Sequence, residues 1–128
     1  MNTATPVPNH QKIIELNTIW YNLITSEYHK DRDCHFYIYT HYFYGDDAQY
    51  TVEHKGYINH RYEDTHWDTY EEAEKELIRL LREMIIEEID WYLSIPEPQT
   101  MGCEDKHARF DDNQLEDMKK KVLEIAPA

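Results

Sequence analysis

The feature of this sequence best suited to chemistry is a row of charged residues spaced along one predicted helix. Between residues 72 and 90, charged side chains recur at intervals of four, three, four, four and three, which places them on one helical face. Like charges four residues apart weaken a helix by about 0.2–0.5 kcal/mol per pair, so a basic partner would compensate for the row. A solvated face that serves only solubility is the alternative. The row consists of Glu72, Glu76, Arg79, Glu83, Glu87 and Asp90.

The spacing of these carboxylates resembles that of a polyanion. Side chains about 6 Å apart along a helix approximate the separation of phosphates along one DNA strand. At 1.5 Å per residue the row extends over about 27 Å. We therefore predict that it binds a basic protein surface. The predicted contact residues are Glu72, Glu76, Glu83, Glu87 and Asp90.

The histidines are a second candidate site. The chain has eight, and His54 and His60 would point the same way on a straight strand, with Glu53 and Asp64 near in sequence. A divalent cation can use such a set, so a metal-dependent hydrolase built on His54 and His60 is one alternative function. Zinc sites usually include a short-spaced pair of ligands, and the sequence has none before Cys103. We expect no bound metal and no cofactor.

Enzymatic motifs are missing from the sequence. Cys34 and Cys103 are too few for a disulfide framework, and Cys103 with His107 lies in a predicted loop that does not by itself hold a thiolate against a base. With three glycines in all, the chain has no GxxxxGK and no GxGxxG loop, and it has no GxSxG or HExxH motif. We therefore predict a non-enzymatic protein without catalytic residues.

The charge balance points to the same conclusion. The chain of 128 residues has 26 acidic and 13 basic residues, a net charge of −13, yet 41% of it is hydrophobic and 13% aromatic. Disordered acidic chains lack such apolar content, so we expect one folded domain at 10–128 behind a flexible lead-in at 1–9. Its field attracts basic proteins and argues against binding to nucleic acid or anionic lipid. Without an apolar run of about 18 residues or a secretory signal, we expect a cytoplasmic protein that does not enter a membrane.

The order of the predicted elements indicates the fold class. Apolar residues at helical spacing predict three helices, the second opened by a capping box at Thr69–Glu72 and ended by Pro96. Aromatic and β-branched runs predict two strands and a short third. This order predicts an α+β fold, in which a small antiparallel sheet of two or three strands packs against an N-terminal helix, a long central helix and a short C-terminal helix. The helices are predicted at 10–28, 69–95 and 112–125, and the strands at 34–44, 49–62 and 61–67.

The hairpin presents a tyrosine-rich outer face. A three-residue turn that pairs Tyr44 with Ala48 gathers the apolar residues on one face of the hairpin. The other face then carries tyrosines, which are enriched at protein interfaces, so we predict a second partner-binding surface there. Alternatively another layer or a second copy of the chain covers it, the latter giving a homodimer; stacking of nucleic-acid bases needs a positive field that this chain lacks. The predicted contact residues are Tyr37, Tyr39 and Tyr57.

In size and charge the chain resembles phage-borne and plasmid-borne inhibitors of nucleic-acid-handling enzymes, among them DNA mimics, anti-restriction proteins and anti-CRISPR proteins. The resemblance includes no motif, so it assigns no residue a role. It implies an inhibitor that occupies the basic nucleic-acid-binding groove of a partner protein. A toxin-neutralising immunity protein or antitoxin would present the same acidic surface and is the main alternative.

Overall fold

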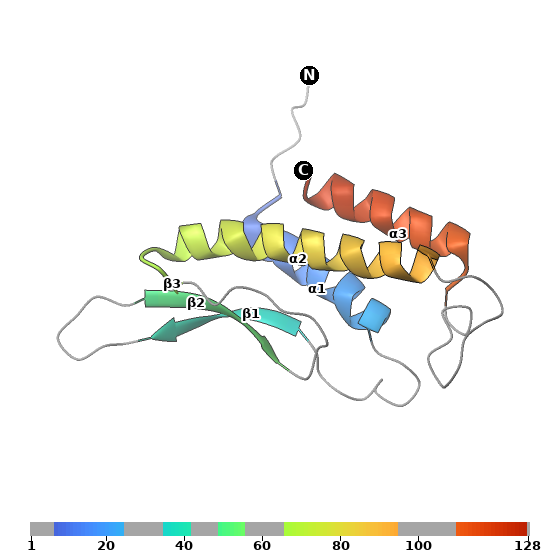
Figure 1. The fold of residues 1–128 in the computed structure, drawn as a ribbon. Helices are drawn as coiled ribbons and strands as arrows, with labels where there is room; N and C mark the ends of the chain where they lie inside the picture. Colours follow the sequence, from blue (N-terminus) through green and yellow to red (C-terminus); the bar gives the residue numbers. More distant parts are fainter. Residues whose placement is uncertain (1–6, 25–34, 42–48, 56–65, 95–109, 128) are drawn as a thin grey trace, which may run out of the picture.

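The computed structural model describes residues 7–24, 35–41, 49–55, 66–94 and 110–127. These residues form three helices and a three-stranded antiparallel sheet (Figure 1), which confirms the predicted α+β class. The predictions made for 1–6, 25–28, 34, 42–44, 56–65 and 95 lie outside the described residues. The elements are α1 (Asn9–Ile24), β1 (His35–His41), β2 (Gln49–Lys55), β3 (His66–Trp67), α2 (Tyr70–Ser94) and α3 (Asp112–Ile125).

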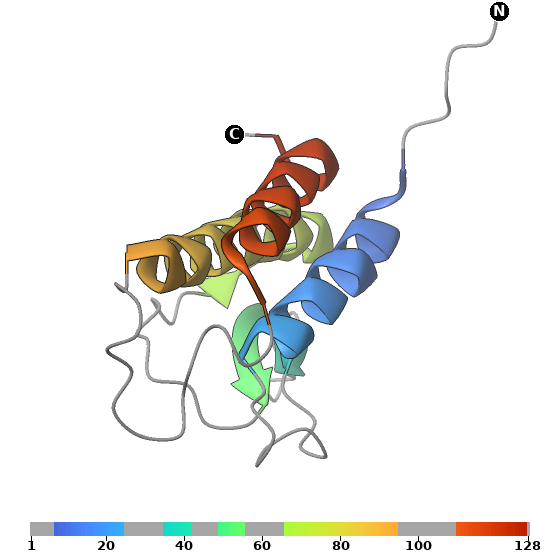
Figure 2. The ribbon, with the colours of Figure 1, turned by 90° about the vertical axis from the view of Figure 1, so that its right-hand side faces the viewer.

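The helices are stacked on one face of the sheet. α1 and α2 lie side by side over it, and α3 lies against both of them on the side away from the sheet (Figure 1; Figure 2). α2 therefore sits in the middle of the molecule, in contact with the sheet, α1 and α3. One side of this long helix is left for solvent.

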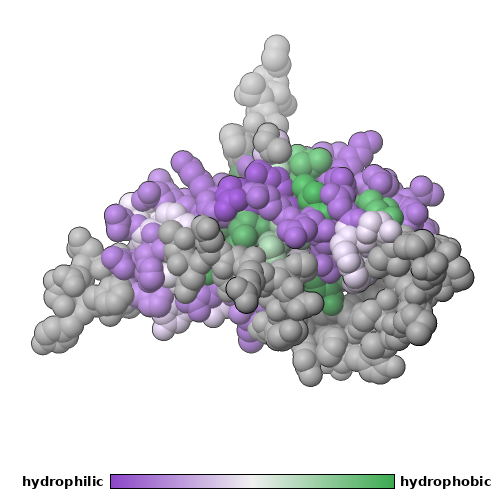
Figure 3. Space-filling model, viewed as in Figure 1, coloured by the Kyte–Doolittle hydropathy of each residue, from purple (hydrophilic) through white to green (hydrophobic). Residues whose placement is uncertain are grey.

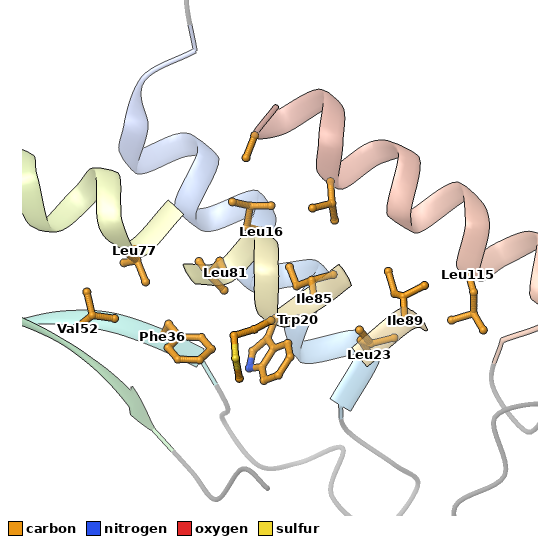
Figure 4. Packing of buried hydrophobic residues seen from close by; sticks show 13 residues of the cluster. Leu16, Trp20, Leu23, Phe36, Val52, Leu77, Leu81, Ile85, Ile89 and Leu115 are labelled. Carbon is orange, nitrogen blue, oxygen red and sulfur yellow. The ribbon is translucent and has the colours of Figure 1, made fainter. Parts of the chain in front are cut away.

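The hydrophobic core fills the space between these layers. Buried residues of α1 and α2 recur at steps of three and four, apart from the adjacent pair Met84 and Ile85, as the predicted apolar stripes require. They pack against Phe36 of β1 and Val52 of β2, which lie below them in Figure 4, while Leu115 and Val122 of α3 complete the core. The helical contributors are Leu16, Trp20 and Leu23 of α1 and Leu77, Leu81, Met84, Ile85 and Ile89 of α2.

The hairpin has the predicted faces but not the predicted register. Ile38 lies opposite Val52 and Tyr39 opposite Thr51, which is two residues away from the pairing that would join Tyr44 to Ala48. A shift of two residues preserves the alternation of faces, so the apolar residues still point to the helices. The apolar pattern determines which side chains share a face, but it does not determine how far one strand slides along the other.

An asparagine of α1 protects the edge of the sheet. β1 is an edge strand, and Asn17 Nδ2 donates to the Phe36 carbonyl while the Phe36 backbone N–H donates to Asn17 Oδ1, both at 2.9 Å. The side-chain amide thus makes the pair of hydrogen bonds that a neighbouring strand would make. It also fixes α1 against the sheet.

We expect Asn17→Ala to lower the free energy of unfolding by about 1–2 kcal/mol, because two partly buried backbone groups lose their partner. Urea denaturation monitored by circular dichroism measures the change. Asn22→Ala on the exposed side of α1 is the matched control and should alter stability by less than about 0.5 kcal/mol. Equal effects of the two substitutions would contradict a stabilising role for the Asn17 bonds.

Candidate functional site

The acidic helix begins where the sequence predicts it. The Glu72 backbone N–H donates to Thr69 Oγ1 at 3.2 Å, and the Thr69 hydroxyl donates to Glu72 Oε1 at 2.8 Å. This side-chain bond is a variant of the predicted capping box, and it holds the Glu72 carboxylate at the first turn. Glu71 and Glu72 lie in that turn, where the helix dipole favours negative charge.

The charged row lies on the side of α2 opposite its buried residues. Leu77, Leu81 and Ile85 are buried, whereas the side chains of Glu83 and Asp90 are 53% and 51% exposed. We call this surface the acidic face of α2. It consists of Glu72, Glu76, Arg79, Glu83, Glu87 and Asp90, of which Glu76 is half-buried and the others are exposed.

Basic residues of the same chain neutralise part of this face. Arg79 forms ion pairs with both Glu76 and Glu83, and hydrogen bonding to Glu76, followed by Glu83, raises the pKa of Arg79. Lys119 of α3 reaches Asp90 with Nζ 2.8 Å from Oδ1, and this bond raises the pKa of Lys119. The row is therefore less uniformly negative than the sequence pattern suggested.

Glu87 is different from its neighbours on the acidic face. Within the described part of the chain it takes part in no ion pair. The ion pairs around it are exposed, and such pairs contribute about 0–1 kcal/mol each. A basic partner can therefore exchange them for its own contacts with little loss.

The negative charge of the molecule is concentrated on α2. This helix has eight acidic and three basic residues, a net charge of −5 out of −13, whereas α3 has four acidic and three basic residues. Hydrophilic side chains cover most of the visible surface over these two helices (Figure 3). α2 is thus the strongest source of negative potential among the helices.

An exposed tryptophan borders the acidic face, and the sequence patterns did not single it out. Trp91 is 53% exposed and follows Glu87 by four residues, one helical turn. Its ring meets that of Tyr92 edge-on at 5.1 Å between centroids. Trp91 comes one residue before the half-buried Tyr92 and therefore lies just outside the apolar stripe of α2. This position in the sequence predicts an exposed side chain.

The outer face of the hairpin carries a polar network of three side chains. His41 Nε2 lies 2.9 Å from Thr51 Oγ1, and the Thr51 hydroxyl donates to Glu53 Oε2 at 2.9 Å. Thr51 is buried, so these bonds satisfy a polar group that is shielded from water. Beside the network Tyr39 is 47% exposed and Tyr37 half-buried, while the predicted Tyr57 lies outside the described residues.

The two predicted partner-binding surfaces lie on different sides of the molecule. Phe36 and Val52 point from the sheet to α2, so Tyr37 and Tyr39, on the other side of the strands, point away from it. The acidic face lies on the side of α2 that the sheet, α1 and α3 leave uncovered. The two surfaces therefore do not form one continuous patch, and we treat the acidic face of α2 as the main candidate site.

His54 belongs to the core side of the sheet. Its Nε2 accepts a hydrogen bond of 2.9 Å from Trp20 Nε1, and its ring packs edge-on against Phe36 at 4.6 Å between centroids. This nitrogen is therefore engaged with the fold. His60, Asp64, Cys103 and His107, the other residues considered for metal binding or catalysis, lie outside the described residues.

Neither a metal centre nor a membrane helix is found in the described ranges. No group of three or more His, Cys, Asp or Glu side chains there is arranged to hold an ion, and no helix there is long and apolar enough to cross a bilayer. Comparison with protein-family models, with curated proteins and with solved structures found no match to this chain. Its function is therefore inferred from the charge and exposure of its surfaces.

Proposed function

We propose that this is a non-enzymatic interaction protein that occupies the basic, nucleic-acid-binding groove of a partner protein and blocks access of the nucleic acid. The supporting observation is the acidic face of α2, where exposed carboxylates line one side of a 25-residue helix of net charge −5. From Glu72 to Asp90 the face extends over about 27 Å, the rise of about eight nucleotides of one DNA strand. A groove that binds such a strand offers cations at a suitable spacing.

Electrostatic attraction supplies the recognition in this proposal. A negative face accelerates encounter with a positive groove and disfavours acidic partners. Glu87 offers a carboxylate that no basic residue of the described chain pairs with, and Glu83 and Asp90 exchange weak internal pairs for contacts with the partner. Binding by this mechanism decreases steeply as salt is raised.

We expect Glu83→Gln combined with Glu87→Gln to weaken partner binding about tenfold, since two charge–charge contacts of about 0.7 kcal/mol each are lost. Affinity capture from a cell lysate identifies the partner. Titration of that purified partner over a salt series, with duplex DNA as competitor, then measures affinity. Asp117→Asn combined with Glu124→Gln is the matched control, because it removes the same charge from exposed positions of α3.

Two outcomes would contradict the proposal. Equal affinity and equal salt dependence of the two double variants would mean that the acidic face is not the contact surface. A captured partner that duplex DNA and RNA do not displace would mean that no nucleic-acid-binding groove is occupied, and an immunity or antitoxin function would replace the one proposed.

A further inference from the structure

The exposure of Trp91 is not explained by the packing of the fold. Its side chain is 53% exposed, whereas Trp20, the tryptophan of the core, is fully buried. Tryptophan is highly buried on average in folded proteins and is among the residues most enriched at the centres of protein interfaces. An indole left in solvent beside the acidic face is therefore a candidate anchor for a partner.

The indole and the Glu87 carboxylate are neighbours on α2. Residues four apart in a helix have Cβ atoms about 5–6 Å from each other. Side chains in a helix also lean toward its N-terminus, which directs a side chain at position 91 toward the turn that carries Glu87. A flat aromatic surface and a carboxylate without an internal ion pair thus stand together.

The charges near the C-terminal end of α2 have the opposite sign to those that the helix dipole favours there. After Arg82, α2 contains Glu83, Glu87, Glu88 and Asp90 and no basic residue, and its last turn has none either. The C-terminal end of a helix has a partial negative charge and favours cations there. Among the described ion pairs, the cation at this end of α2 is Lys119, which reaches Asp90 from α3. A cation from a partner would therefore relieve an unfavourable charge arrangement as well as bind.

The geometry points to an arginine-binding subsite formed by Trp91 and Glu87, in which a guanidinium of the basic partner stacks on the indole and pairs with the carboxylate. This subsite rests on the proposed function, because it specifies what the acidic face recognises. The planar guanidinium is more weakly hydrated than an ammonium group and stacks better on an aromatic ring. The occupant is therefore a protein segment that presents arginine rather than lysine.

Hexa-arginine and hexa-lysine peptides test the subsite directly, because they have the same number of cationic side chains and differ in the group presented. We expect the protein to bind fluorescently labelled hexa-arginine about fivefold more tightly than hexa-lysine at low salt, as judged by anisotropy. Trp91→Ala should abolish this preference, and so should Trp91→Leu, which keeps an apolar side chain without a π face. Tyr70→Ala, which removes an aromatic side chain of similar exposure at the other end of α2, should retain it.

The outcomes separate this inference from the proposed function. No arginine preference in the unaltered protein, or a preference that survives both Trp91 substitutions, would overturn the subsite. If the unaltered protein shows no arginine preference, and the Glu83→Gln, Glu87→Gln variant binds neither peptide, the acidic face is a binding surface but the subsite does not exist. If neither peptide binds the unaltered protein, both proposals are wrong.

Discussion

Leu81→Ala is expected to lower the free energy of unfolding by about 2–5 kcal/mol, the largest stability loss predicted here for a single substitution. Leu81 is fully buried at the middle of α2, where α1, the sheet and α2 meet (Figure 4). Removing three carbons there takes away apolar burial and leaves a cavity that neighbours fill only in part. Because domains of this kind are stable by about 5–15 kcal/mol, the loss is a large part of the total.

The control for this substitution is Leu123→Ala on α3. Leu123 is 38% exposed, so the same chemical change at that position should cost less than about 1 kcal/mol. Urea and thermal denaturation of both variants measure the difference. A similar loss at both positions would show that the centre of the core is not where α2 crosses the sheet.

The helices were the part of the fold most open to prediction. α3 spans the predicted residues, and Asp111 caps it, with Gln114 completing a capping box. The start of α2 follows from Thr69, whose hydroxyl accepts from the Glu72 backbone. These signals are local, because a cap and an apolar stripe lie within a few residues of the atoms they organise. Local signals do not require knowledge of the rest of the chain.

The sheet shows the limit of local signals. The alternation of Phe36, Ile38 and Thr40 gave the face of β1 correctly, but the register with β2 differs by two residues. β3 is two residues long and pairs with β2 only at Tyr50 and Thr51. The register depends on the turn and on packing with the helices, and neither can be read from the alternation of apolar and polar residues along a strand.

The alignment of the carboxylates on α2 was predictable from the sequence, but the residues that surround and pair with them were not. Helical spacing alone aligns Glu83, Glu87 and Asp90, and the pairing of Arg79 with Glu83 follows from the same spacing. The bond from Lys119 to Asp90 joins residues 29 apart in sequence, so it depends on how α3 packs. The exposure of Trp91 and the separation of the two predicted surfaces likewise depend on which sides of α2 the other elements cover.

The same dependence on packing explains why a histidine in the sequence is part of the core in the structure. Trp20 of α1 is fully buried, and its indole N–H has to find an acceptor there. His54 of β2 provides it at 2.9 Å while stacking edge-on with Phe36. The bond joins the first helix to the central strand, across 34 residues of sequence.

We expect His54→Ala to lower the free energy of unfolding by about 2–4 kcal/mol, because it leaves the buried Trp20 N–H without this acceptor and removes a packed ring. Trp20→Phe removes the donor, so the double variant should be less destabilised than the sum of the two single variants, by about 0.5–3 kcal/mol. Urea denaturation of the four proteins gives this coupling, with His10→Ala on the exposed side of α1 as a control of small effect. Strict additivity would mean that the bond does not link α1 to the sheet, and the core would then be held together by apolar contacts alone.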